Sequence, residues 1–238
     1  LTTGLSRPPI VTQTHRDDAT LADFATTMRG IATGANEFFF LTREQEQRTG
    51  IPATFFRTAI GRTRDVPEAE ISENVLARLE TLGRPTRLLA LDSRAIDQFP
   101  PAIREYLRYG EKIGLPKKSL ISQRKPWYKM ETRPVPPFLF AYLGRRSARF
   151  IRNSAGVLPL TGFLCVYPHS DDPTFLKKLW AVLQHPDTIA LLPRVGKSYG
   201  SGAIKVEPRA LELLPIPSAV LREVGLTVPV RLKQAALL

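Results

Sequence analysis

The chain has 238 residues, 43% of them hydrophobic, and a formal net charge of +12 at pH 7. This length suits one large domain or two small ones, and the apolar content is sufficient for a core. The single cysteine, Cys165, excludes internal disulfides and a cysteine-based zinc site within one chain; its apolar surroundings predict a core position in a cytoplasmic protein. The apolar run 156–167 contains Pro159 and is too short to span a bilayer. No basic stretch shows a strong amphipathic helical pattern, so no membrane partner is expected.

The first residues, Leu1 to Gly4, contain neither an initiator methionine nor a basic-then-apolar signal pattern. We therefore expect a fragment of a longer chain. Residues 1–18 are predicted to be an N-terminal extension or cut-off linker, 19–217 the main domain, and 218–238 a tail packed on that domain.

Side-chain spacing and capping residues predict the following elements in chain order. A helix is expected to begin at Thr20, with Leu21, Phe24, Ala25 and Met28 on one face, and another to lie between a capping Thr42 and Gly50. Further helices are expected over 73–82, over 101–112, from Pro173 after a capping Asp172, and over 207–214. Strands are expected over 37–41, 87–91, 138–143, 148–151 and 160–167. Because βαβ spacing is irregular and there are 21 prolines, the predicted fold is α+β: a single domain with a mixed β-sheet, irregular Pro-rich connections and peripheral helices.

Positive charge is concentrated in one part of the chain. Residues 101–152 contain thirteen lysines and arginines and three acidic residues, an excess of ten that accounts for most of the net charge. Such a concentration, interspersed with aromatic residues, favours a polyanionic partner.

The triplet Gly196-Lys197-Ser198 resembles the end of a nucleotide-binding phosphate loop. That loop needs a glycine five residues before the triplet, where this chain has Leu191, and it uses backbone N–H groups, which Pro193 lacks. The pattern therefore excludes a phosphate-loop NTPase.

Other enzyme classes find no support either. No aspartate or glutamate has a lysine two residues later, as a common class of metal-dependent nuclease requires, and the three histidines have no nucleophile or carboxylate at a characteristic spacing. The sequence "VPPF" at 135–138 lacks the polar first residue of an amino-methyltransferase motif. This chain by itself is not expected to be an enzyme.

Binding chemistry is concentrated in "SQRKPWYKMETRP", residues 122–134. Lysine and arginine neutralise phosphates, and arginine also binds the guanine edge. The candidate DNA-binding residues here are Arg124, Lys125, Trp127, Tyr128, Lys129 and Arg133. The two aromatic rings either anchor the segment in the core or contact sugar and base.

Two further segments contribute candidates. Residues 144–153 supply Arg145, Arg146, Arg149, Arg152 and Asn153, with one strand face predicted to be basic and the other buried. Asn153 either bonds an adenine edge or forms a turn. The glycine-rich stretch supplies Lys197, Ser198 and Lys205, which either hold DNA phosphates or belong to a hairpin exposed to water.

Five stretches occur in an order that resembles a known family: "RGIATGANEFFFL", "FPPAIREYLRYGEKIGL", "RKPWYKMETRPVPPFLFAYLGRR", "RFIRNSAGVLPLTGFLCVYP" and "GSGAIKVEPRALELLPIP". The chain is similar to the C-terminal target recognition domain of restriction–modification N6-adenine DNA methyltransferases, and to half of a type I restriction specificity subunit. The resemblance covers roughly residues 19–217.

The resemblance implies that this chain binds double-stranded DNA and selects the sequence. It implies that a separate N-terminal domain of the same parent chain binds S-adenosylmethionine and methylates adenine, so no cofactor is expected here. That catalytic domain and a restriction subunit are the protein partners it suggests. An RNA-binding module, with single strands stacked on Trp127 and Tyr128, or a protein-interaction module is the alternative.

Overall fold

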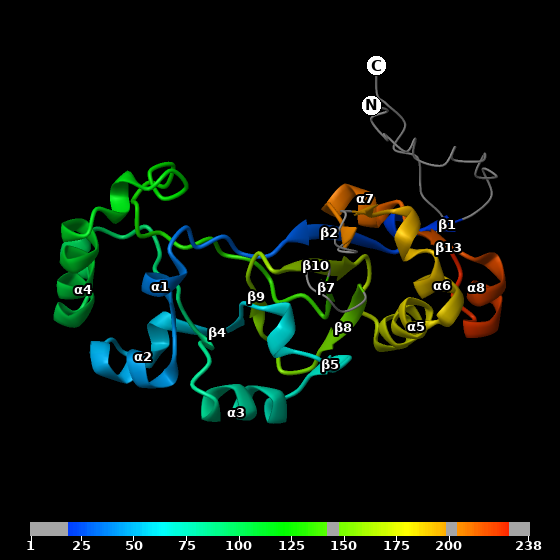
Figure 1. The fold of residues 1–238 in the computed structure, drawn as a ribbon, viewed down its shortest axis with the longest axis horizontal. Coiled ribbons are helices and arrows are strands. Elements are labelled where there is room, and N and C mark those ends of the chain that lie inside the picture. The colour runs from blue at the N-terminus through cyan, green and yellow to red at the C-terminus, as the bar shows by residue number, and fades with distance from the viewer. Residues whose placement is uncertain (1–18, 142–147, 199–203, 229–238) are drawn as a thin grey trace, which may run out of the picture.

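A computed structural model describes residues 19–141, 148–198 and 204–228 (Figure 1). The helices in these ranges are α1 Asn36–Phe39, α2 Arg43–Thr49, α3 Glu73–Thr81, α4 Pro101–Lys112, α5 Pro173–Gln184, α6 Pro186–Ala190, α7 Pro208–Glu212 and α8 Ser218–Val224. The strands are β1 Ala19–Thr20, β2 Ala25–Arg29, β3 Phe40–Leu41, β4 Phe56–Ile60, β5 Glu70–Ile71, β6 Arg87–Leu89, β7 Phe138–Ala141, β8 Arg149–Asn153, β9 Leu158–Pro159, β10 Phe163–Pro168, β11 Lys197–Ser198, β12 Ile204–Lys205 and β13 Pro215–Ile216. The predicted single-domain α+β class is confirmed.

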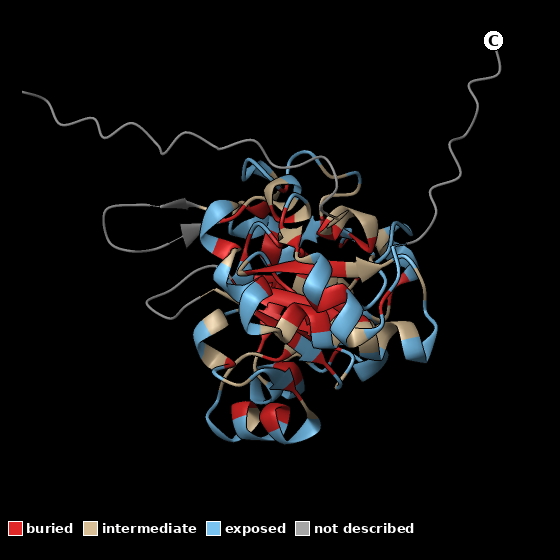
Figure 2. Ribbon diagram, turned by 90° about the vertical axis from the view of Figure 1, so that its right-hand side faces the viewer, coloured by how far each residue is buried: buried red, intermediate tan, exposed pale blue. Residues whose placement is uncertain are grey.

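A five-stranded mixed sheet forms the centre, in the order β2-β10-β7-β8-β5, with β5 and β8 parallel and the other pairs antiparallel. Successive side chains of a strand point to opposite faces. Phe140 and Phe150 pack on one face with residues of α5, α7 and α8, whereas Leu139 and Ile151 pack on the other with residues of α3. Figure 2 shows these buried strands in the middle of the molecule and the exposed outer faces of the helices around them.

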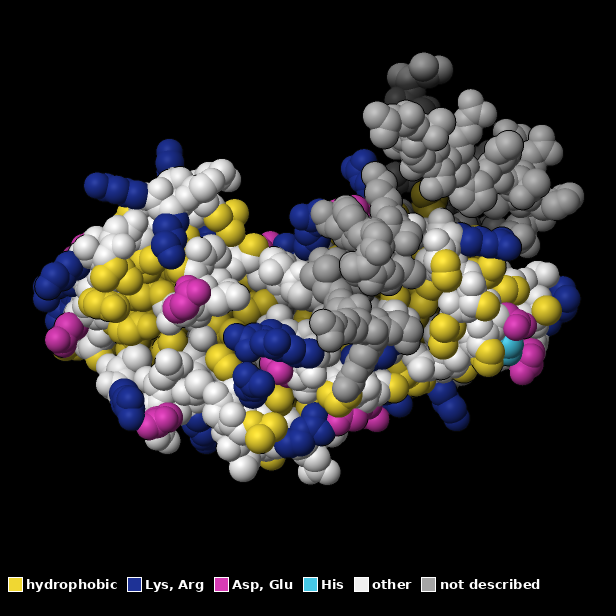
Figure 3. Space-filling view, in the orientation of Figure 1, with side chains coloured by type: hydrophobic (Ala, Val, Ile, Leu, Met, Phe, Trp, Pro, Cys, Tyr) yellow, Lys and Arg dark blue, Asp and Glu magenta, His cyan; other side chains and the backbone are white. Residues whose placement is uncertain are grey.

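A second mixed sheet, in the order β3-β6-β4-β9, belongs to a lobe at one end of the molecule. Its core is formed by α1, the inner face of α4 and the segment that follows α4, including the buried residues Phe39, Leu107 and Ile121. The sequence predicted one sheet, but the structure has two larger ones. In Figures 1 and 3 the molecule is elongated, and its upper outline dips between this lobe and the end that carries β2 and α7.

Helix boundaries follow the predicted caps closely. The Thr42 side chain accepts a hydrogen bond from the backbone N–H of Gln45, the backbone N–H of Thr42 donates to the Gln45 side chain, and α2 ends at Gly50 with a φ of 65°. The Asp172 carboxylate accepts the N–H of Phe175 at 2.7 Å at the start of α5. The helix predicted over 101–112 has these bounds in the structure.

Two predictions near the N-terminus are wrong. The helix expected from Thr20 is a short 3-10 turn followed by β2, in which Ala25 and Thr27 are buried while Met28 is 44% exposed. Pairing of β2 with β10 outweighs the weak helical pattern of this segment. The strand expected over 37–41 begins as α1 and becomes extended only at β3.

None of the helices in the described ranges combines the length and apolarity needed to cross a membrane. The same ranges contain no cluster of three or more His, Cys, Asp or Glu side chains suited to a metal ion. Cys165 is buried in the central sheet, and burial raises the pKa of its thiol. This confirms the expected core position of Cys165.

Candidate nucleic-acid interface

The segment 112–129, here called the lysine loop, runs from the end of α4 along the upper end of the lobe. It contains six cationic residues and no acidic one: Lys112, Lys117, Lys118, Arg124, Lys125 and Lys129. The five lysines are exposed, and none of their ammonium groups forms a hydrogen bond or ion pair with the described parts of the chain. Figure 3 shows Lys and Arg side chains projecting from this end of the lobe.

Several arginines elsewhere in the lobe are paired with acids. Arg43 contacts Glu80, Arg48 contacts Glu44, and Arg94 contacts Asp92. The lysine loop is by contrast a surface of uncompensated charge, which a polyanion can neutralise. Lys112, Lys117 and Lys118 were not among the predicted site residues, although the absence of acids between 112 and 129 was a signal for them.

The backbone of the lysine loop is anchored to the core of the lobe by buried side chains and hydrogen bonds. Leu115 and Ile121 are buried at 2% and 0% exposure, and the N–H of Met130 donates to Leu91 O at 2.8 Å. The hydroxyl of Tyr106 on α4 donates to Phe38 O at 2.8 Å, and burial raises the pKa of that tyrosine to about 12. The loop thus presents its lysines from a preorganised support, which reduces the ordering cost of binding.

Trp127 and Tyr128 take the core role rather than an exposed one. Tyr128 is 3% exposed, its hydroxyl donates to Arg94 O at 2.7 Å, and burial raises its pKa. The half-buried Trp127 lies 5.9 Å from the ring of Phe38, and a Cβ on Gly110 would be 2.6 Å from the indole. Both rings hold the loop against the core of the lobe.

Arg124 and Arg133 are engaged with the protein. The Arg124 guanidinium donates to Ala32 O and lies 5.8 Å from the centre of the Phe39 ring, and its burial lowers its pKa. Arg133 donates to Glu131 at 2.7 Å and to Arg29 O. These two arginines tie the segment 122–134 to the end of β2 and the residues after it.

The arginines of β8 do not share a face, so the prediction of one basic face is wrong. Arg149 and Arg152 are three positions apart, and an odd separation places side chains on opposite sides of a strand. Arg149 lies on the α3 side and donates to Val66 O, whereas Arg152 is exposed on the α5 side.

Asn153 is 8% exposed and its side chain is fully occupied. Its amide nitrogen donates to Pro136 O at 2.7 Å and to Val157 O at 2.9 Å, and its oxygen accepts the N–H of Val157 at 3.0 Å. Of the two roles considered for Asn153, the structure shows the turn-stabilising one.

Asn153→Ala is expected to destabilise the fold by about 2–3 kcal/mol, because three backbone groups lose a buried partner. Urea unfolding measures this loss. DNA sequence preference, measured under conditions where the variant remains folded, should be unchanged. A stable variant with altered preference at one base pair would contradict this structural role.

The remaining candidates can be placed only in part. Arg145 and Arg146 lie outside the described residues. Lys197 and Lys205 are paired in register between β11 and β12, with Ser198 opposite Ile204, so the backbone on both sides of the glycine-rich turn is antiparallel. Their side chains are likewise outside the described part of the structure.

Comparison with known proteins identifies the family. Residues 10–234 match the family described as the C-terminal domain of Type II methyltransferase M.Eco57I. The chain belongs to this family. It is 26% identical over 190 residues to Type II methyltransferase M.AccI of Acinetobacter calcoaceticus, covering 79% of this chain and 34% of the relative. It is 24% identical over 208 residues to Type II methyltransferase M.XamI of Xanthomonas campestris pv. amaranthicola, covering 84% of this chain and 36% of the relative.

The fold of this family member also resembles that of a solved structure. The type IIG restriction endonuclease BpuSI matches with a TM-score of 0.52 and 16% identity, over 88% of this chain and 26% of the endonuclease. At that identity the likeness concerns the fold. The chain spans about a third of the length of its two curated relatives.

Proposed function

We propose that this chain is the target recognition domain of a restriction–modification DNA methyltransferase and binds double-stranded DNA in a sequence-specific way. The observation that carries the proposal is the lysine loop, with six cations and no acid on a rigid support. It forms the raised end of the lobe beside the dip in the upper outline of the molecule (Figures 1 and 3). Membership of a methyltransferase C-terminal family supplies the context.

The geometry disfavours the RNA-binding alternative. Proteins that bind single strands without sequence preference stack successive bases on exposed aromatic rings. Here Tyr128 is buried and Trp127 is half-buried against Phe38, so neither ring is a fully exposed stacking surface. Free lysines over buried aromatic anchors suit a phosphate backbone instead.

Methylation of adenine at N6 with S-adenosylmethionine is proposed for the remainder of the parent protein. S-Adenosylmethionine carries a sulfonium, an ammonium and ribose hydroxyls, which acidic and backbone acceptors bind. A cavity between the central sheet and α5 is lined by Arg152 and Lys177, and none of its lining residues in the described part of the chain is acidic. That cavity does not fit this cofactor, and we assign the methyl-transfer step to another domain.

Titration of a random-sequence duplex pool at 50 and 200 mM salt tests the proposal, followed by sequencing of the bound fraction. If each of the five free lysines contacts one phosphate, affinity should fall by about 500-fold between the two salt concentrations. The bound fraction should be enriched in one short sequence. Salt-independent binding, or preferential competition by single-stranded RNA, would contradict duplex recognition.

A further inference from the structure

A pocket of about 430 Å³ lies between the central sheet and the first turns of α5. Its lining residues are Pro137, Phe138, Arg152, Asn153, Ser154, Pro173, Leu176, Lys177 and Trp180. None of the residues of the lysine loop takes part. The pocket is therefore a separate feature, with a volume in the range of small-molecule sites.

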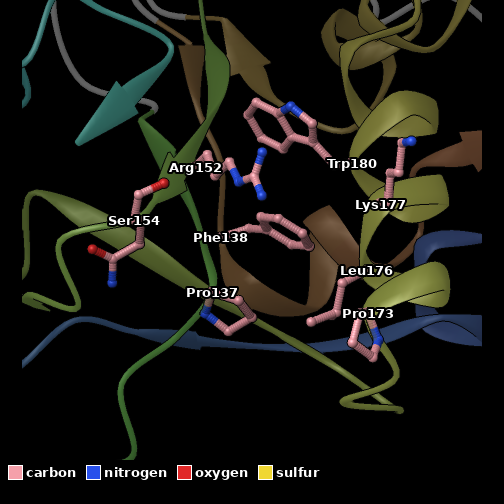
Figure 4. A pocket seen from close by; sticks show the side chains of 9 residues that line it. Pro137, Phe138, Arg152, Ser154, Pro173, Leu176, Lys177 and Trp180 are labelled. Atoms are coloured by element: carbon pink, nitrogen blue, oxygen red, sulfur yellow. The ribbon is translucent and has the colours of Figure 1, made fainter. Parts of the chain in front are cut away.

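The pocket combines a flat aromatic wall with two cations. The rings of Phe138 and Trp180 are stacked, with centroids 5.3 Å apart and an interplanar angle of 20°. Figure 4 shows Arg152 from β8 and Lys177 from α5 on the two sides of the pocket, with these rings between them. Both cationic side chains are exposed, and their charged groups form no hydrogen bond or ion pair within the described residues.

Glu70 lies opposite Arg152 in the register of β5 and β8, but within the described residues neither it nor Asp172 forms an ion pair with these cations. Glu70 accepts a hydrogen bond from the Ser154 hydroxyl, and Asp172 accepts the backbone N–H of Phe175. An anionic group on the ligand would therefore meet two unpaired positive charges beside an apolar surface. Phosphate is the anion that such cations commonly bind, and an aromatic base is the flat group that stacks on indole.

The polar groups that line the pocket offer little base selection. The Asn153 amide is occupied by its backbone partners, and the Ser154 hydroxyl is bonded to Glu70. A bound ring would thus be held by stacking and its charge by Arg152 and Lys177. An extended peptide fits less well, because β8 is paired with β7 on one side and β5 on the other and cannot accept another strand.

We propose that this pocket binds a single nucleotide unit, with the base against Trp180 and the negative charge of the phosphate attracted by Arg152 and Lys177, without strong preference among bases. The unit is either a free mononucleotide or an unpaired nucleotide of single-stranded DNA. This site is independent of duplex recognition by the lysine loop.

Binding to the 238-residue chain is followed by calorimetry and by the indole N–H resonances of its two tryptophans, assigned with Trp180→Phe. Thymidine monophosphate should shift the Trp180 resonance and leave that of Trp127 in place. Thymidine and inorganic phosphate should each bind at least about tenfold more weakly than the nucleotide, because each makes only part of the contacts. Equal binding of either fragment, or a shift of Trp127 alone, overturns the proposal.

The double variant Arg152→Gln/Lys177→Gln should bind the nucleotide at least about tenfold more weakly, since two charge-assisted contacts are lost. The matched control Arg57→Gln/Arg222→Gln removes two exposed cations from β4 and α8 and should bind normally. If nucleotide binding is weakened equally in both double variants, the effect is one of overall charge, and the proposed site is rejected.

A hexathymidylate oligonucleotide separates the two sources of the ligand. If it binds more tightly than the mononucleotide and loses that affinity in the double variant, single-stranded DNA supplies the nucleotide. If only the mononucleotide binds, the ligand is a free nucleotide. If neither the oligonucleotide nor the mononucleotide binds, or if an acidic aromatic peptide binds more tightly than either, the nucleotide site is rejected. This conclusion holds whether or not duplex binding is observed.

Discussion

Replacing four lysines of the lysine loop by glutamine is expected to cause the largest loss of DNA affinity. The variant carries Lys117→Gln, Lys118→Gln, Lys125→Gln and Lys129→Gln. Each phosphate contact contributes about 0.9 to the slope of log affinity against log salt, so the slope should fall by up to about 3.6. Because backbone contacts do not distinguish bases, all duplex sequences should lose affinity to a similar extent. Titration of the selected and a scrambled duplex at several salt concentrations measures both effects.

A control with the same change in net charge isolates the role of position. Four exposed arginines outside the lysine loop are replaced by glutamine: Arg43, Arg48, Arg64 and Arg222. The slope should then remain close to that of the parent chain. Equal losses in the two variants would mean that overall charge, rather than the lysine loop, governs binding. If the lysine variant changes discrimination at one base pair, a lysine contacts a base instead of phosphate.

Gly30→Ala is expected to be among the most destabilising substitutions, at about 3 kcal/mol, because backbone atoms occupy the space that a Cβ requires. That Cβ would lie 2.1 Å from Leu160 O and 2.7 Å from Pro159 O. The close approach is fixed by hydrogen bonds from the N–H of Gly30 to Phe163 O and from that of Ile31 to Pro159 O, at 3.0 and 2.8 Å. Urea unfolding monitored by circular dichroism measures the loss.

Gly83→Ala provides the comparison. Gly83 has a φ of +62°, but no atom lies within 4 Å of the position that an alanine Cβ would take. Only the left-handed backbone penalty of about 1 kcal/mol is therefore expected. A smaller loss at Gly30 than at Gly83 would show that β9 can move away from the chain at Gly30. The junction between the lobe and the central sheet would then be less rigid than the structure indicates.

The two regions differ in what they contribute to the proposed recognition. The junction at Gly30 and Leu160 holds the lobe on the central sheet, so Gly30→Ala should alter stability first. The lysine loop projects from the lobe, so its lysines should alter affinity with little change in unfolding. Measuring the free energy of unfolding and the DNA affinity of both variants therefore distinguishes residues that stabilise the fold from residues that contact DNA.

The sequence by itself determined the local features. Capping residues such as Thr42 and Asp172 set the starts of helices, because a cap depends on neighbours within three positions. The run 112–129, which contains six cationic residues and no acidic one, determined which surface of the lobe carries an excess of positive charge. Cys165 was placed in the core because an apolar run along a strand indicates burial.

Tertiary structure alone decided how the candidate residues are used. β2 became a strand because β10 lies beside it, and Trp127 became an anchor because Gly110 leaves room for its ring. Arg124 is engaged with Ala32 O while the ammonium group of the adjacent Lys125 has no partner among the residues that the structure describes, although both residues carry the same charge. Such outcomes depend on groups that are distant in the chain and adjacent only after folding, and for that reason local sequence patterns could not predict them.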